Sequence, residues 1–365
     1  MSTPPRAGAE ELQEKRSRVL AAARTRGADA VLLTSPTALT WLLDGARVHV
    51  SLAGPPVAAA VVHPDGVGLG VHANEADRLL EEEIGPEVAE GLGLRTHALA
   101  WHRPLDPAGA WWPGSAASAP LAEEQLAGAL RGARAPLLPA ELARYRALCA
   151  DTAAVATDVL ATASAGESEA ALASRLTAGV AAVGADPLVV LVGGSTRSAV
   201  RHPLPTTAPL GDRALVVLCA RRAGMIANLS RWVEPRGPVD PARHEAIWQV
   251  EADVLDALRP GTSFTDLLST VRDAYPRHGF DAAEWSRHHQ GGAAGYAGRD
   301  PRLGPGVADV VTTRQVFAFN PTAPGAKVED TVLVTAGGVE VLTVDPRWPS
   351  RPVRGRARPA PLVPV

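Results

Sequence analysis

The chain has 365 residues, 46% hydrophobic and 21% charged, which is typical of a soluble globular protein with two domains. Its net charge of −3 argues against bulk electrostatic binding to nucleic acid or an anionic membrane, and no apolar run approaches the roughly 18 residues that a membrane span needs. Two cysteines are too few for a disulfide framework or a structural zinc site, and the polar N-terminus lacks an apolar signal core, so we expect a cytoplasmic protein.

The first third of the chain alternates predicted helices with predicted strands. A helical pattern ends at Gly27, and Ser35-Pro36 is a favourable start for a short helix through Leu43. The expected helices are residues 9–26, 36–43 and 75–84, and the expected strands are 30–34, 57–63, 67–71 and 94–100. This alternation predicts an α/β domain, which we place at residues 1–135.

A linker at residues 133–139 precedes a different pattern. The expected helices are 140–163, 167–182, 241–258 and 264–278, and the expected strands are 188–192, 214–220, 225–233, a short one near Val316, and 329–334. Helices and strands that arrive in separate groups predict an α+β domain at residues 139–345. The remaining residues, 346–365, are rich in proline and arginine, and we expect an extended, solvated tail.

Four short segments of the second domain resemble motifs of the creatinase, prolidase and aminopeptidase P family. They are Arg201-His202-Pro203-Leu204-Pro205-Thr206, residues 211–231, residues 289–296, and Phe319-Asn320-Pro321 with Val328-Glu329-Asp330-Thr331. The resemblance implies an α+β protein in which a C-terminal pita-bread domain follows a smaller α/β creatinase-type N-terminal domain. It also implies a homodimer, because relatives use that N-terminal domain to pair.

Most members of that family bind two divalent metal ions through two aspartates, one histidine and two glutamates. Carried over residue by residue, these positions fall on Val217, Asn228, Gly292, Asn320 and Glu329. Only Glu329 is the residue type that binds metal at its position in the family. One carboxylate cannot offset the charge of two divalent cations. We therefore expect a site with no metal and no other cofactor.

Period-two alternation along the strands predicts what lines this cavity instead. If Val217 faces the cavity, so do the side chains two and four residues later, because successive side chains of a strand point to opposite faces. Each buried polar group without a partner costs about 1–3 kcal/mol, so a polar set here favours a binding pocket over a structural core. The expected pocket contains Cys219, Arg221, Asn228, Ser230, Asn320 and Glu329, with Gln290, Tyr296 and Arg299 near its edge.

Several of these residues also have a purely structural interpretation. His202 matches a histidine that shuttles protons in creatinase-like enzymes, but it could instead stabilise the turn before Pro203. Cys219 is either a nucleophile or an inert core thiol. Arg299 stands where the family has a second histidine, and it could instead form a salt bridge with Asp300. His288 and His289 are adjacent in sequence and cannot share one strand face, so we expect no metal pair there.

The resulting hypothesis is a metal-independent, creatinase-like hydrolase that cleaves a C–N bond of a small, carboxylate-bearing substrate. His202 is the expected general acid and base, and Glu329 orients the substrate. Arg221 and Arg299 are expected to hold the carboxylate, while the amides of Asn228, Gln290 and Asn320 and the side chains of Cys219 and Tyr296 complete the pocket. Two alternatives are an inactive family member that binds a ligand or a protein, and an Xaa-Pro aminopeptidase-like metallopeptidase with an atypical site.

Overall fold

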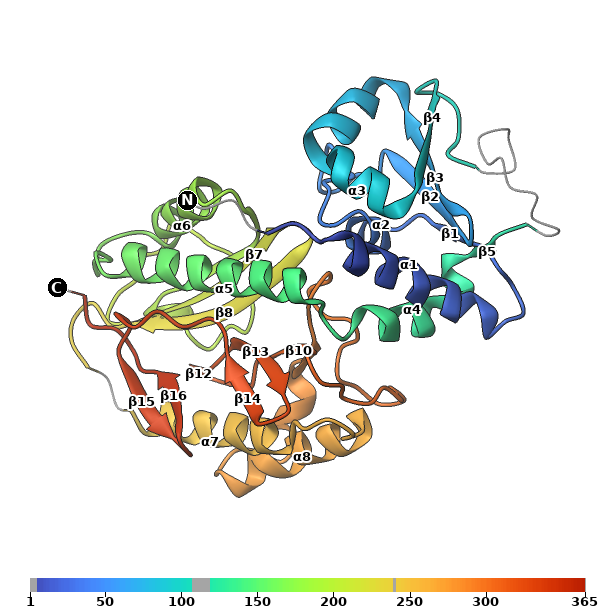
Figure 1. Cartoon of the computed structure of the whole chain (residues 1–365). Coiled ribbons are helices and arrows are strands. Elements are labelled where there is room, and N and C mark those ends of the chain that lie inside the picture. The colour runs from blue at the N-terminus through green and yellow to red at the C-terminus, as the bar shows by residue number, and fades with distance from the viewer. Residues whose placement is uncertain (1–4, 107–118, 239–240, 365) are drawn as a thin grey trace. The chain divides into compact units, whose positions relative to one another are not determined.

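The computed structural model describes residues 5–106, 119–238 and 241–364 (Figure 1). The chain divides into two compact units, and each is described by itself. One unit comprises Met1–Arg144 with Ala223–Met225, and the other comprises Tyr145–Arg222 with Ile226–Val365.

The first unit is built on a five-stranded mixed sheet in the order β4-β3-β2-β1-β5. Its strands are β1 (Val31–Leu33), β2 (Ala58–His63), β3 (Gly66–His72), β4 (Leu94–Leu99) and β5 (Leu121–Ala122). Its helices are α1 (Ala9–Arg24), α2 (Pro36–Leu42), a π-helical turn (Arg78–Ile84), α3 (Gly85–Leu92) and α4 (Ala127–Arg134). The predicted start of α2 is confirmed, because the Ser35 hydroxyl accepts a hydrogen bond from the N–H of Ala38 and Pro36 occupies the first turn.

The second unit contains two main sheets. One has the order β6-β7-β8, formed by β6 (Asp186–Gly193), β7 (Ala214–Arg222) and β8 (Met225–Val233). The other has the order β14-β13-β10-β9, formed by β9 (Gly291–Ala293), β10 (Val316–Phe319), β13 (Asp330–Thr335) and β14 (Gly338–Val341). Two short strands, β11 (Thr322–Ala323) and β12 (Ala326–Lys327), form a hairpin between β10 and β13.

Helices cover the strands of this unit. In Figure 1, α5 (Pro139–Leu160) and α6 (Glu169–Ala182) lie along one side of the strands, and α7 (Ala242–Ala257) and α8 (Phe264–Arg277) lie along the other. An extensive apolar core packs α7 and α8 against side chains of β10 and β13, with the rings of Phe264 and Phe317 5.7 Å apart between centroids. Burial of these side chains stabilises the unit, because apolar surface is removed from water.

The two sheets meet where β8 approaches the start of β13. Ser230 of β8 forms an antiparallel bridge with Glu329, and the N–H of Ile226 donates to the carbonyl of Gly295 at 2.9 Å. Side chains from β7, β8, the loop after β9 and the β12–β13 junction therefore converge at this seam.

The expectation of a solvated tail is wrong. Residues 350–359 form a hairpin of β15 (Ser350–Val353) and β16 (Arg356–Pro359), whose two turn residues, Arg354 and Gly355, have positive φ angles of 46° and 78°. Arg358 is 1% exposed and pairs with two buried carboxylates of the second unit, Glu251 and Asp330. Charge pairing, which a composition rich in arginine and proline does not reveal, fixes this segment.

Candidate functional site

Glu329 stands at the centre of the candidate site. It is 2% exposed, and its backbone carbonyl accepts a hydrogen bond from the N–H of Ser230 at 2.9 Å. Arg299 Nη2 donates to Glu329 Oε1 at 2.6 Å, and Lys327 Nζ lies 3.6 Å from Glu329 Oε2. Two buried cations therefore share one buried carboxylate.

Arg299 also contacts the second strand of the seam. Its Nη1 donates to Asn228 Oδ1 at 3.0 Å, and Asn228 Nδ2 donates to the carbonyl of Ile226 at 3.0 Å. Asn228, Arg299 and Glu329 thus lie together, as the alternation of the strands and the family motifs predict. The Arg299 guanidinium therefore contacts Asn228 and Glu329, which occupy two of the five positions that hold metal ligands in the family.

Lys327 is the member of the site that sequence reasoning missed. It is 3% exposed, and burial lowers the pKa of its ammonium group although Glu329 opposes the shift. A compositional signal was available, because only two of the 36 basic residues are lysines. The other, Lys15, is also fully buried and pairs with Asp44 at 3.3 Å and with Glu141 at 3.1 Å. In this arginine-rich chain, both lysines have buried carboxylate partners.

Two predicted pocket residues of β7 have different surroundings. Cys219 is partly buried, and burial followed by the charge of Glu329 raises the pKa of its thiol to about 12. A thiol protonated at neutral pH is a poor nucleophile, which favours the inert interpretation. The expectation that Arg221 brings an uncompensated charge is wrong, because its Nη2 lies 3.0 Å from Asp186 Oδ2 on the adjacent strand.

The side-chain amide of Gln290 forms hydrogen bonds with other residues of the fold. Its Nε2 donates to the carbonyls of Trp285 at 2.8 Å and His288 at 2.7 Å, and its Oε1 accepts from Tyr275 Oη at 2.8 Å. Gln290 therefore fixes the backbone before β9, and the expectation that its amide binds substrate directly is not supported. Tyr296 is also buried, at 7% exposure.

Two of the predicted polar residues keep an unused hydrogen-bonding atom. Ser230 Oγ and Asn320 Oδ1 are buried, and neither has a hydrogen-bond partner within the described part of the chain. The Nε of Arg299 is also buried and has no hydrogen-bond partner among the described residues. Such groups are rare in folded proteins, and they fit a site that contains water or a ligand.

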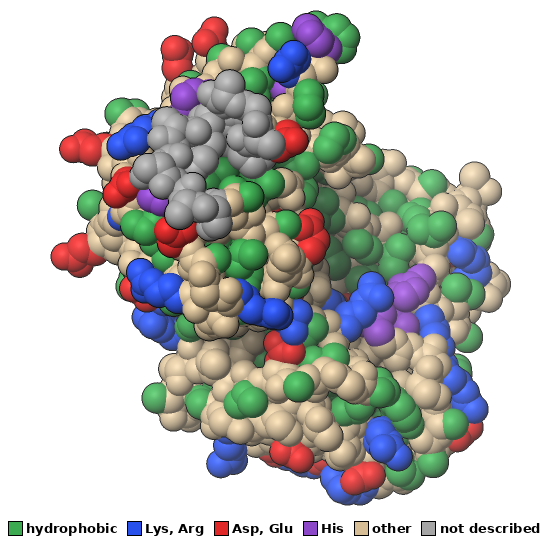
Figure 2. Space-filling view, turned by 90° about the vertical axis from the view of Figure 1, so that its right-hand side faces the viewer, with side chains coloured by type: hydrophobic (Ala, Val, Ile, Leu, Met, Phe, Trp, Pro, Cys, Tyr) green, Lys and Arg blue, Asp and Glu red, His purple; other side chains and the backbone are tan. Residues whose placement is uncertain are grey.

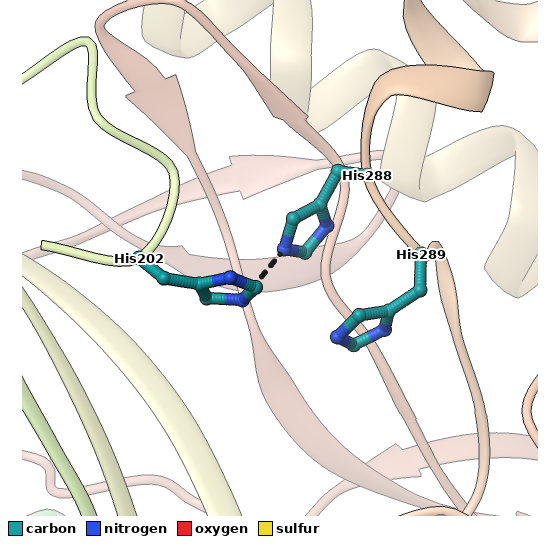
Figure 3. A group of neighbouring side chains, drawn as sticks. All are labelled: His202, His288 and His289. Carbon is teal, nitrogen blue, oxygen red and sulfur yellow. Dashed lines mark hydrogen bonds between the residues drawn. The ribbon is translucent and has the colours of Figure 1, made fainter.

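Three histidines lie beside this cluster. His202, in the loop between β6 and β7, has its Nε2 3.0 Å from His288 Nε2, and the rings of His288 and His289 stack at 4.4 Å (Figure 3). The argument that His288 and His289 cannot share one strand face does not apply, because both residues precede β9 and lie outside any strand. Burial, reinforced by Lys327, lowers the pKa of His202 and brings that of His288 to about 2.

A cavity of about 430 Å³ adjoins His288 and His289. Its apolar wall consists of Leu268, Trp285, Leu303 and Pro305. On the face shown in Figure 2, histidine side chains gather beside those of Lys and Arg. The site therefore combines a cationic polar cluster with a cavity that has an apolar wall on one part and polar side chains, including His288 and His289, on another.

Comparison with models of protein families shows to which family the chain belongs. The model of metallopeptidase family M24 matches residues 143–336, just over half of the chain. The chain belongs to metallopeptidase family M24. M24 is a family of hydrolases, so the predicted family, the pita-bread fold and the assignment to hydrolases are confirmed. No curated protein matches the chain significantly.

Solved structures share the fold of this M24 chain along nearly its whole length. The dipeptidase PepE from Mycobacterium ulcerans superposes with a TM-score of 0.75 at 20% identity, covering 99% of this chain and 100% of that one. The prolidase from Pyrococcus horikoshii gives 0.69 at 16% identity, covering 92% and 99%. The N-terminal domain of a FACT complex subunit from chickpea gives 0.65 at 12% identity, covering 91% and 96%.

The residues of this M24 chain do not fit the two metal ions of the family. Val217 and Gly292 have no ligand atom, and Arg299 already occupies Asn228 Oδ1 and Glu329 Oε1. A histidine is also excluded at position 292, where φ is +145° and a Cβ would lie 2.7 Å from Leu303 N and closer still to the carbonyl of Pro301. The loss of the dinuclear site therefore involves the backbone as well as the ligands.

Within the residues that the structure describes, none of the helices of this M24 chain has the length and apolar character needed to cross a membrane.

Proposed function

We propose that this M24 chain is a metal-independent hydrolase that cleaves a C–N bond of a small, carboxylate-bearing substrate in the cytoplasm. The observation that carries the proposal is the position of Arg299, whose guanidinium bridges Asn228 and Glu329. In this position a fixed cation of the protein provides positive charge where M24 relatives have metal ions. Activity would then need no metal.

The charge balance of the site supports an anionic substrate. Arg299 and Lys327 bring two buried positive charges against the single carboxylate of Glu329. A buried charge without a partner is costly, so a bound carboxylate would complete the balance. Lys327 therefore replaces Arg221 as the second residue proposed to hold the substrate carboxylate. The charge of Arg221 is already paired with Asp186.

His202 is the proposed general acid and base. Burial lowers the pKa of its imidazole, so the ring is neutral and able to accept a proton at pH 7. In the proposed reaction, His202 removes a proton from water as the water oxygen bonds to the carbon of the amide or amidine group. The C–N bond then breaks, and His202 returns the proton to the leaving nitrogen. Arg299 and Lys327 stabilise negative charge that develops on the substrate.

The test is a turnover screen of chelator-treated protein with dipeptides, small amides and guanidino compounds, half of them carrying a carboxylate. We expect turnover of a carboxylate-bearing compound that persists in EDTA and falls at least 100-fold in His202→Ala. Unchanged turnover in His202→Ala would remove this residue from the mechanism. Activity that appears only after metal is added would instead establish the atypical metallopeptidase.

A binding module is the second candidate function. It is supported by the replacement of four of the five family ligand positions, at Val217, Asn228, Gly292 and Asn320. Calorimetry on the same compounds separates the two functions. Micromolar binding of a carboxylate-bearing compound without any turnover would establish a ligand-binding protein and exclude the hydrolase for that compound class.

A further inference from the structure

We propose that His202, His288 and His289 form a binding site for one late first-row transition-metal ion, with Zn²⁺ as the reference ion. One nitrogen from each ring lies within 4.8 Å of the others, and all three imidazoles converge on the same space (Figure 3). This site shares no residue with the positions of the family's dinuclear centre. It is formed by the loop after β6 and by the segment that precedes β9.

The spacing of the nitrogens suits coordination to a single ion. At a Zn–N distance of about 2.05 Å, two ligands of a tetrahedral site are separated by roughly 3.3 Å. His202 Nε2 and His288 Nε2 lie 3.0 Å apart, close to that separation. The ring of His289 stacks on His288 and faces His202, with ring centres 6.0 Å apart. One nitrogen of His289 lies within 4.8 Å of the ligand nitrogens of the other two rings, so all three can be directed at one ion.

Structural hydrogen bonds do not use every nitrogen of the neighbouring rings. The Nδ1 atoms of His288 and His289 are buried, and neither has a hydrogen-bond partner among the residues that the structure describes. Two neighbouring imidazoles that each bury an unpaired nitrogen are costly in a purely structural role. An ion bound by one nitrogen of each ring, Nε2 in the case of His288, would fix the orientations of the three imidazoles.

The surroundings determine which ions can bind. The ligand set contains only imidazole nitrogens. The charges of Arg299, Lys327 and Arg302 act on His289 and oppose a cation, and the carboxylate of Glu329 acts in the other direction. Hard ions such as Mg²⁺ and Ca²⁺ need carboxylate or carbonyl oxygens, which this set lacks. Zn²⁺, Ni²⁺ and Cu²⁺ form strong bonds to imidazole, so we expect the site to bind these ions. Because nearby cations oppose binding, we expect an affinity on the order of micromolar rather than picomolar.

Metal binding has a consequence that rests on the proposed function. An ion bound to His202 uses the lone pair that the hydrolytic mechanism needs for proton transfer. The metal-loaded protein would therefore lack its general base, and Zn²⁺ would act as an inhibitor. The three-histidine site is thus a regulatory site for a metal-free hydrolase.

The test is isothermal titration of untagged, chelator-treated full-length protein with ZnCl₂. We expect one Zn²⁺ per chain, at least tenfold weaker binding in His289→Gln, and no heat with MgCl₂. The matched control is His102→Gln, which replaces an exposed histidine of the first unit and leaves affinity unchanged. Circular dichroism melts confirm that each variant is folded, and His288→Gln is the second variant if His289→Gln does not fold.

Cobalt provides a readout independent of heat. Co²⁺ bound by three imidazoles gives visible absorption bands, which should be present in the native chain and in His102→Gln and absent in His289→Gln. Zn²⁺ binding that His289→Gln leaves unchanged, or no stoichiometric binding at all, would overturn the site. If Zn²⁺ binds as expected but does not inhibit turnover, the site stands and the general-base role of His202 fails.

Discussion

At the scale of single residues, the site depends most on Arg299. It contacts Asn228 and Glu329, and both the charge balance and the misfit to metal ions depend on it. Its neighbour Lys327 provides the second cation. The site therefore depends on a guanidinium with a planar fork of donors, which lysine cannot reproduce.

We predict that Arg299→Ala lowers the free energy of unfolding by about 3 kcal/mol, because it leaves Glu329 buried with only Lys327 as a partner. Urea denaturation measures this loss. Arg299→Lys keeps the charge but loses the fork, so it should recover about half of the stability. A loss of less than about 0.5 kcal/mol for the alanine variant would mean that Arg299 is a surface residue.

His244 provides a prediction about pH. It is buried in α7, its Nε2 lies 2.6 Å from Arg213 Nη2, and burial followed by the Arg213 charge lowers its pKa to about 4. Between pH 6.5 and about 4 the unfolded chain therefore binds the proton and the folded chain does not. The associated stability is fully present above pH 6.5 and is lost as pH falls to about 4, amounting to roughly 3 kcal/mol.

Chemical denaturation of the native chain and of His244→Gln at pH 7 and pH 4.5 isolates this contribution. The lowered pKa values of His202, His288 and His289 change stability in the same direction, so the difference between the two proteins is the relevant quantity. The native chain should lose about 2–3 kcal/mol more than the variant over this interval. Equal losses would show that His244 keeps an ordinary pKa.

At the scale of elements, the C-terminal hairpin is attached to the second unit by buried charges. Arg358 Nε and Nη2 contact the two carboxylate oxygens of Glu251 at 2.6 and 2.7 Å, and Nη2 also lies 2.8 Å from Asp330 Oδ2. Arg231 pairs with Asp330 at 3.0 Å from the other side. The hairpin β15–β16 is therefore joined to α7, β8 and β13 through one network.

We predict that Arg358→Ala destabilises the protein by about 4 kcal/mol, since it leaves two buried carboxylates without their shared partner. The matched control is Arg351→Ala on the exposed face of β15, which should cost less than about 0.5 kcal/mol. Thermal and urea melts of the two variants provide the comparison. Similar small effects in both would mean that the hairpin does not contribute to the stability of the second unit.

At the scale of the whole molecule, the chain has the complete length of the dipeptidase and prolidase structures that it matches. The family resemblance implies pairing through the N-terminal domain, and we predict a homodimer. Multi-angle light scattering at micromolar concentration should give twice the chain mass of 37.9 kDa. A mass of one chain at that concentration would contradict the prediction.

Local patterns in the sequence determined much of this protein. Helical periodicity and the Ser35-Pro36 start predict α1 and α2, because both depend on contacts within a few residues. Family motifs identify the seam at Asn228 and Glu329, because each motif is a short contiguous segment.

Only the tertiary structure decided the partners of the charged groups. His202 and His288 are separated by 86 positions, and Arg299 and Glu329 by 30, yet each pair is in hydrogen-bond contact. Arg221 lies on a predicted strand, but the adjacent strand supplies Asp186, which pairs with its charge. No periodicity specifies such pairs, because loops and neighbouring strands bring charges together only after the core has packed. The same physical reason explains why the ion pair of Lys327 with Glu329 and the three-histidine cluster were found only in the folded chain.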